Sequence, residues 1–302
     1  MNATLALLAV IANAHQRKYK QGIVRWLGPD SLGLAFRLYS WFIEPVEQQL
    51  TPAVPMSKYG QTPTGPGEYR ETGAKAVRPR DAATLIIVKN DDTPRVLMGK
   101  RAASHKFMPN KFVFPGGRLD YIDQRLRVMS SLCAPVMTRL TAETRQNVST
   151  NKLTGLALAS IRETFEETGL VVGTPNDKPM KSSNSVWQAY FDHGVEPPLE
   201  KMDLIARAIT PPYRTRRFDT RFFMVHEDAL IDTERTNHGP SGELLDLHWL
   251  TLDEAREREL PAITRMILDV VEERLTLPRA KQLEAPAPFV RFINSKPVTS
   301  NL

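Results

Sequence analysis

The chain of 302 residues is 41% hydrophobic, which is enough for a buried core in one large domain or two small ones. Its formal charge of +6 at pH 7 suits a small polyanionic substrate but is too mild to require nucleic acid as a partner. The single cysteine, Cys133, excludes an internal disulfide, so we expect a protein of a reducing compartment such as the cytoplasm.

We expect residues 1–75 to form an N-terminal extension that is flexible or lies outside the catalytic unit. Residues 3–13 are apolar but too short to span a bilayer, and no basic residue precedes them as in a secretory signal. The basic segment that follows leaves a membrane-surface helix or a targeting peptide open. A further hypothesis is that translation starts at Met56 and that residues 1–55 add nothing to catalysis, which mass spectrometry of the native N-terminus tests.

Two apolar runs separated by turn residues predict a β-hairpin with strands at 82–89 and 95–101. Residues 112–114 make a further short strand that runs into the glycine pair Gly116 and Gly117. Glycines let the chain turn sharply and let a phosphate or a metal ion come close to the backbone.

Three carboxylates, Glu163, Glu166 and Glu167, are spaced i, i+3, i+4, which places them on one face of a helix. Like charges so close destabilise an isolated helix, and Mg²⁺ or Mn²⁺ would compensate them, because these ions prefer carboxylate oxygens. Arg162 is expected to brace the carboxylates, and Gly169 to end the helix. The alternative is an acidic face that is simply solvated.

The carboxylates belong to a helix predicted over residues 156–168, with Thr154 as the residue that caps its first turn. Apolar residues on the other side of this helix form a stripe that packs on the sheet: Leu156, Leu158, Ile161 and Phe165.

The strand and glycine pair at 112–117, with the later sequence 162–170, resemble the two halves of the Nudix hydrolase box. Gly117 matches the first glycine of that motif, and the second half is matched by Arg162, the three glutamates, Gly169 and Leu170. Asp123 stands where the family has a glutamate, and 38 positions, 124–161, separate it from Arg162 where the family has seven. The resemblance therefore implies a Nudix box that is split by an insertion.

Membership of this family implies an α/β fold, the Nudix α/β/α sandwich with a mixed β-sheet between helices. The domain is expected over residues 76–295, with the insertion at 124–154 and a C-terminal tail at 296–302. Amphipathic spacing predicts one or two short helices in the insertion, which either selects substrate or decorates the surface.

The reaction that the resemblance implies is hydrolysis of a nucleoside diphosphate linked to another moiety. Glu163, Glu166 and Glu167 would hold one to three Mg²⁺ or Mn²⁺ ions, which lower the pKa of the attacking water. Asp123 would substitute for the box glutamate. A Nudix module that binds a nucleotide without cleaving it is the alternative of a different class.

Residues 97–117 also resemble the motif of Nudix enzymes that cleave coenzyme A, with matches at Leu97, Arg101, Ala102 and 114–117. Departures fall at Met98, Gly99, Lys106 and Asn110, although Lys106 keeps a positive charge. Coenzyme A or an acyl-CoA is therefore the leading substrate, with Arg101, Lys106, Gly116 and Gly117 in contact with it. The alternative substrates are ADP-ribose, NADH and dinucleoside polyphosphates. The alternative for Arg101 and Lys106 is a position on the solvated side of the strand and loop, without substrate contact.

Four arginines fall within residues 214–221, and an arginine fork binds phosphate in a bidentate manner. We expect Arg217 and Arg221 to contact substrate, unless this strand pairs with acidic neighbours such as Asp219. The sequence of residues 216–223 resembles the coenzyme A diphosphatase subfamily, of the peroxisomal type and its bacterial relatives. That resemblance spans about residues 78–295.

The C-terminal half is expected to add Glu243 as an extra metal ligand or the general base.

The predicted partner is a nucleotide-type small molecule. Nucleic acid and stable membrane insertion are not expected, and a homodimer stays open. Further predicted elements are helices at 185–193, 251–259 (capped by Thr251) and 261–275 (starting at Pro261), and strands at 204–209, in the second half of 210–225, at 243–250 and at 289–293.

Overall fold

The computed structural model describes residues 75–90, 92–101, 111–231, 244–294 and 296–302. The chain divides into two units, 1–56 and 57–302, and every described residue belongs to the second. Some predictions therefore lie outside the described residues: those for 1–74 with Met56, and those for Ala102, Lys106, Asn110 and Glu243.

A mixed sheet forms the centre of the described part, where nine strands join in the order β11-β10-β7-β8-β1-β2-β3, with β4 on β1 and β9 on β2. The β1/β8 and β7/β10 pairs are parallel, and the other pairs are antiparallel. The strands are β1 (Arg80–Lys89), β2 (Arg95–Arg101), β3 (Phe112–Val113), β4 (Gly116–Arg118), β7 (Asp203–Ile209), β8 (Phe218–His226), β9 (Leu244–Thr251), β10 (Pro288–Ile293) and β11 (Lys296–Asn301), with β5 (Thr174–Pro175) and β6 (Val195–Glu196) in a separate pair.

Strand β1 is buried on both faces. Leu85 and Ile87 belong to the hydrophobic cluster that includes α4, whereas Ile86 and Val88 are fully buried outside that cluster. Because side chains alternate across a strand, the continuous apolar run of β1 is what a strand covered on both sides requires.

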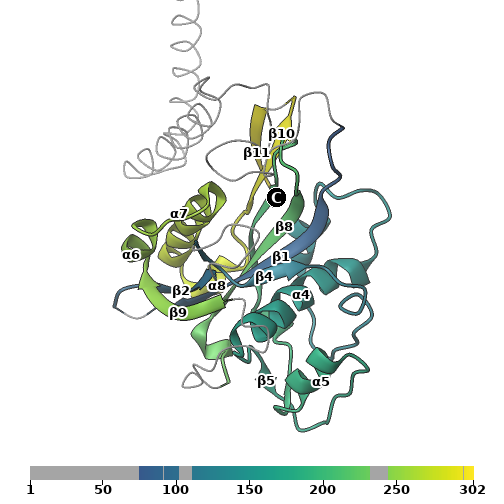
Figure 1. The fold of residues 1–302 in the computed structure, drawn as a ribbon. Helices are drawn as coiled ribbons and strands as arrows, with labels where there is room; N and C mark the ends of the chain where they lie inside the picture. Colours follow the sequence, from purple (N-terminus) through teal and green to yellow (C-terminus); the bar gives the residue numbers. More distant parts are fainter. Residues whose placement is uncertain (1–74, 91, 102–110, 232–243, 295) are drawn as a thin grey trace, which may run out of the picture. The chain divides into compact units, whose positions relative to one another are not determined.

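Helices cover both faces of the sheet (Figure 1). Helix α4 (Thr150–Thr168) packs against β1 and β4 on one face, and α7 (Ala262–Thr276) packs against β7 on the other. This arrangement confirms the predicted α/β/α sandwich. No helix in the described ranges is long and apolar enough to cross a membrane. The other helices are α3 (Ala134–Thr141), α5 (Ser185–Phe191), α6 (Leu252–Arg256) and α8 (Arg279–Gln282), with short 3₁₀ turns at Leu199–Lys201 and Glu227–Ala229.

The ends of the helices agree with the predictions at two places and differ at one. Gly169 ends α4 in the left-handed conformation, with φ of 73°, and Thr251 caps α6 through a capping box with Glu254. The predicted cap at Thr154 is wrong, because α4 starts a turn earlier, where the Ser149 side chain accepts the N–H of Lys152.

Two predicted segments also change. Residues 296–302, expected as a tail, form strand β11, which pairs along the whole length of β10. The segment 124–154 contains one complete helix, α3, and its last residues are the first turn of α4. Amphipathic spacing found the helical character of this segment but not the point at which the second helix joins α4.

Candidate active site

The two distant halves of the predicted motif meet around Arg162, whose side chain is only 4% exposed. Its guanidinium donates from Nε to Asp123 Oδ1 at 2.9 Å and from Nη2 to Asp123 Oδ2 at 3.0 Å. Such a two-point pair fixes the plane of both groups. Helix α4 is thereby tied to the segment that follows β4, although 39 positions separate the two residues.

Asp123 is fully buried and accepts four hydrogen bonds. Besides the two bonds from Arg162, it accepts the backbone N–H of Asp120 at 3.0 Å and the indole N–H of Trp187 at 3.0 Å. A carboxylate offers about four acceptor sites, so these bonds occupy all of them. In this arrangement Asp123 holds Arg162 and has no oxygen lone pair left for a metal ion.

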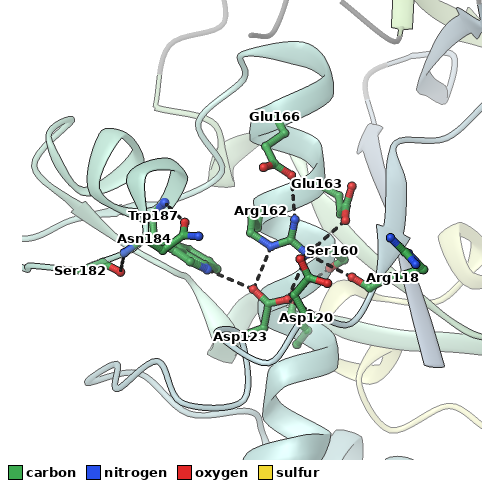
Figure 2. A network of polar contacts seen from close by, with 11 residues as sticks. Arg118, Asp120, Asp123, Ser160, Arg162, Glu163, Glu166, Ser182, Asn184 and Trp187 are labelled. Atoms are coloured by element: carbon green, nitrogen blue, oxygen red, sulfur yellow. Dashed lines mark hydrogen bonds and ion pairs between the residues drawn. The ribbon is translucent and has the colours of Figure 1, made fainter. Parts of the chain in front are cut away.

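Arg162 also pairs with two of the three predicted metal-binding glutamates (Figure 2). Its Nη1 lies 2.7 Å from Glu166 Oε2, and its Nη2 lies 3.0 Å from Glu163 Oε1. The predicted bracing role of Arg162 matches these contacts. Burial raises the pKa of Glu163 to about 7, with Arg162 opposing the rise and Glu166 adding to it.

The glycine pair lies directly against the same glutamates. The backbone N–H of Gly116 donates to Glu167 Oε2 at 2.9 Å. A Cβ built on Gly117 would overlap the carboxylate of Glu163, so only glycine lets that side chain lie against the strand. The glycines thus serve the close approach that the sequence predicts, here toward carboxylates.

The charges around Arg162 do not balance. Its guanidinium lies within ion-pair distance of four carboxylates, those of Asp120, Asp123, Glu163 and Glu166. The side chains of Glu163 and Glu166 are 19% and 27% exposed, so both are partly open to solvent. A surplus of partly open carboxylates fits the oxygen-donor chemistry of Mg²⁺ or Mn²⁺.

The ligand set is not assembled in advance. Within the described ranges, no three His, Cys, Asp or Glu side chains converge as a metal site. The glutamates are instead bonded to Arg162 and to the backbone of Gly116. Each of these contacts uses one oxygen of a glutamate, Oε1 of Glu163, Oε2 of Glu166 and Oε2 of Glu167. The residues fit a divalent ion by their chemistry, which would be held by remaining lone pairs of the carboxylates.

The chain is similar to known proteins both in sequence and in fold. It is 28% identical over 183 residues to the curated Caenorhabditis elegans protein named "Putative nudix hydrolase 7", and the match covers 57% of this chain and 51% of that protein. The chain therefore spans about half the length of this relative. The crystal structure of a NUDIX hydrolase from Alicyclobacillus acidocaldarius matches with a TM-score of 0.50 and 23% identity, covering 67% of this chain and 97% of that one. The chain has the Nudix fold.

Other comparisons are weaker. The NUDIX domain of Shewanella oneidensis NrtR, solved in complex with ADP ribose, has a TM-score of 0.38 and 12% identity, over 66% of this chain and 90% of that one. No protein-family model matches the chain. The curated relative, together with the Nudix fold, supports the Nudix hydrolase family.

Two arginines predicted to bind substrate have partners of their own within the Nudix fold. Arg221 is buried, and its Nη1 lies 2.8 Å from Asp81 and 3.2 Å from Asp219, as in the alternative that pairs this strand with acidic neighbours. Arg217 donates to the carbonyls of Thr210 and Val77. Substrate contact by these two arginines stays a prediction.

The remaining predicted contacts are less defined. Arg101 is the last residue of β2 and lies opposite Leu244 of β9. Lys106 and Glu243 lie outside the described residues. Sequence reasoning missed two residues of the site, Asp120 and Trp187. Trp187 is 64 positions from Asp123, and no local pattern joins them.

Proposed function

We propose that this protein is a metal-dependent hydrolase that cleaves the diphosphate of a nucleoside diphosphate linked to another moiety. The observation that carries the proposal is the surplus of partly exposed carboxylates around one buried arginine, next to the glycine pair. The Nudix fold and the curated relative support the same reaction class.

Glu163, Glu166 and Glu167 would hold Mg²⁺ or Mn²⁺. When bound, the ion supplies charge neutralisation at the phosphoryl oxygens and lowers the pKa of the attacking water. The work of the chain is positioning: Arg162 orients Glu163 and Glu166, and the N–H of Gly116 orients Glu167. Catalysis of this kind depends on groups that are already in place when charge develops.

Coenzyme A or an acyl-CoA is the proposed substrate, with 3′,5′-ADP and (acyl-)phosphopantetheine as products. The partial coenzyme A motif at 97–117 and the arginine-rich phrase at 214–221 support this choice. ADP-ribose, NADH and dinucleoside polyphosphates contain the same kind of diphosphate and are the competing substrates.

Liquid chromatography of reaction products tests both the proposed reaction class and the proposed substrate. The full chain is incubated with Mg²⁺ or Mn²⁺ and coenzyme A, acetyl-CoA, ADP-ribose, NADH or diadenosine polyphosphates. We expect 3′,5′-ADP from coenzyme A. AMP from ADP-ribose or NADH, with coenzyme A left intact, would keep the reaction class and overturn the substrate.

A matched pair of variants tests the carboxylates. Glu167→Gln removes a buried charge of the proposed site, whereas Glu259→Gln changes a glutamate whose side chain is 76% exposed. We expect Glu167→Gln to lower kcat by about 100-fold or more, as for loss of one charge-stabilising group. An unchanged kcat in Glu167→Gln, with both proteins folded by circular dichroism, would refute the metal assignment.

A further inference from the structure

Trp187 lies on helix α5, outside both halves of the predicted motif, yet its indole reaches the Arg162 pair (Figure 2). The side chain is completely buried, and its Nε1–H donates to Asp123 Oδ1 at 3.0 Å. Because a buried indole N–H has one hydrogen bond to give, this partner defines the orientation of the ring.

The surroundings of Trp187 hold the ring rigidly. It stacks on Phe191 with centroids 5.7 Å apart and meets the edge of Tyr190 at 5.3 Å. The Asn184 side chain caps α5 by accepting the backbone N–H of Trp187 at 3.0 Å. A donor fixed in this way can set the position of a more mobile acceptor.

Asp123 is such an acceptor, because the last torsion of an aspartate side chain has a broad minimum. Its Oδ1 receives both Nε of Arg162 and the indole of Trp187. Two backbone groups also anchor the pair, the N–H of Asp120 on Asp123 Oδ2 and the carbonyl of Arg118, which accepts Arg162 Nη2. The indole bond is the anchor that comes from a different helix, α5, and it acts on the other oxygen of Asp123. Without it, Oδ1 of Asp123 keeps only its bond to Arg162.

Rotation of this pair would move the glutamates. Asp123 uses Nε and Nη2 of Arg162, while Nη1 holds Glu166 at 2.7 Å and Nη2 also reaches Glu163. A guanidinium is planar, so turning one edge displaces the other. A change in the position of Asp123 is therefore transmitted to the two glutamates through a single rigid group, the guanidinium of Arg162.

We propose that Trp187 is a positioning residue whose indole N–H fixes Asp123 and, through Arg162, sets Glu163 and Glu166 for metal binding. This inference rests on the proposed function, since it assigns Trp187 to the same site. The competing view is that Trp187 fills the core and happens to meet a carboxylate. The two views differ in what happens to metal affinity when only the N–H is removed.

Trp187→Phe removes the donor and keeps an aromatic ring, and Tyr190→Phe is its control in the same helix. Tyr190 is equally buried and donates its hydroxyl to the Val172 carbonyl at 2.6 Å, away from Arg162. In the full chain, titrated with Mn²⁺ by calorimetry, we expect Trp187→Phe to weaken Mn²⁺ binding by about tenfold, as for loss of a group behind a metal ligand. Tyr190→Phe should leave Mn²⁺ affinity unchanged.

A double-mutant cycle tests the route through Asp123. If Trp187 acts on that carboxylate, Trp187→Phe should add little further loss of Mn²⁺ affinity in an Asp123→Asn background. Fully additive losses would overturn the route. Equal losses in Trp187→Phe and Tyr190→Phe would overturn the inference, because they would show a general effect of core packing.

A second measurement keeps Trp187 in place and does not depend on the Trp187→Phe protein folding. In the unmodified ¹⁵N-labelled protein, the indole N–H resonance of Trp187, assigned by replacing the other tryptophans in turn, should shift when Mg²⁺ is added. A stationary resonance during saturating Mg²⁺ binding would overturn the inference.

The outcomes separate the two proposals. Wild-type protein that binds Mn²⁺ while Trp187→Phe binds it equally well would overturn the role of Trp187 alone. Wild-type protein that binds no divalent ion would overturn the proposed function, and the role of Trp187 with it.

Discussion

Two buried clusters of arginine and carboxylate lie on this domain, and they differ in charge. In the first, Arg162 faces Asp120, Asp123, Glu163 and Glu166, a formal excess of three negative charges. The second is centred on Asp203, which lies between Arg139 at 2.9 Å and Arg274 at 3.4 Å and has an excess of one positive charge.

The Asp203 cluster is almost wholly buried, although Arg139 Nε and Asp203 Oδ2 have no hydrogen-bond partner among the described residues. Its surplus N–H groups donate to backbone carbonyls near the C-terminus, and all three side chains are at least 94% buried. The Arg162 cluster keeps a surplus of acceptors, two of them partly open to solvent. The comparison teaches that burial and ion pairing alone do not mark a site, whereas an uncompensated and accessible charge does. The accepting carbonyls of the Asp203 cluster are those of Gln282, Leu283, Ala285 and Pro286.

The largest expected effect comes from removing one arginine from each cluster. Arg162→Met should lower the free energy of unfolding by about 3–5 kcal/mol, because it leaves the buried Asp123 without its charged partner. Arg139→Met should lower it by less, because Arg274 still pairs with Asp203 at 3.4 Å. Only Arg162→Met should also lose turnover and Mn²⁺ binding. Urea unfolding and calorimetry check this, and a folded but inactive Arg139→Met protein would contradict the comparison.

Substitution of each of the two neighbouring glycines should separate an effect on stability from an effect on activity. A Cβ on Gly116 would lie 2.5 Å from the carbonyl oxygen of Ala83, so Gly116→Ala must shift the β1/β4 pairing at a cost of about 1–3 kcal/mol. A Cβ on Gly117 meets the flexible end of Glu163. Gly117→Ala should therefore unfold at nearly the same temperature as the wild type but lose about 100-fold in kcat, since a ligand is misplaced. Equal melting temperatures for the two variants would contradict this.

The smallest effect concerns a third group, around Asp81, which pairs with Lys152 at 2.6 Å and with Arg221 at 2.8 Å. Burial favours a higher pKa for Asp81, but Lys152 and Arg221 outweigh it, so the pKa is lowered overall. Its charged form thus stabilises the fold above the usual aspartate pKa of about 4, and this contribution is lost as the pH falls through the lower folded value.

Asp81→Asn should accordingly cost at most about 1 kcal/mol at pH 7, because the side chain is 28% exposed and screened by solvent. The difference from wild type should shrink as the pH falls below about 4. Thermal unfolding at several pH values measures it. A difference that grows on acidification would contradict the assigned sign.

Local patterns in the sequence identified the parts of the site that depend on near neighbours. The spacing of Glu163, Glu166 and Glu167 placed them on one helix, and Gly169 and Thr251 marked helix ends through their own backbone or side-chain chemistry. Each of these signals acts over four residues or fewer. Such features are readable without knowledge of the fold.

Other features depend on partners far away in the chain. The bond from Trp187 to Asp123 joins two elements that the sequence treats separately. Strand β11 contains Pro297 and polar residues, and it forms because β10 lies beside it. For Arg221, the sequence allowed both phosphate and carboxylate partners, and only the pairing of β1 with β8 brings Asp81 within reach.

That pairing of β1 with β8 also bears on how the protein is made. Asp81 and Arg221 are 140 positions apart, and Arg139 bonds the carbonyl of Ala285 across 146 positions. A fold that depends on such long-range contacts forms slowly, because much of the chain must be ordered before these contacts are gained. During synthesis on the ribosome, β1 emerges together with β2 and β4 but well before β8, so the edge of this apolar strand that β8 covers is at first unpaired. Protection of that edge by a chaperone would raise the yield of folded protein.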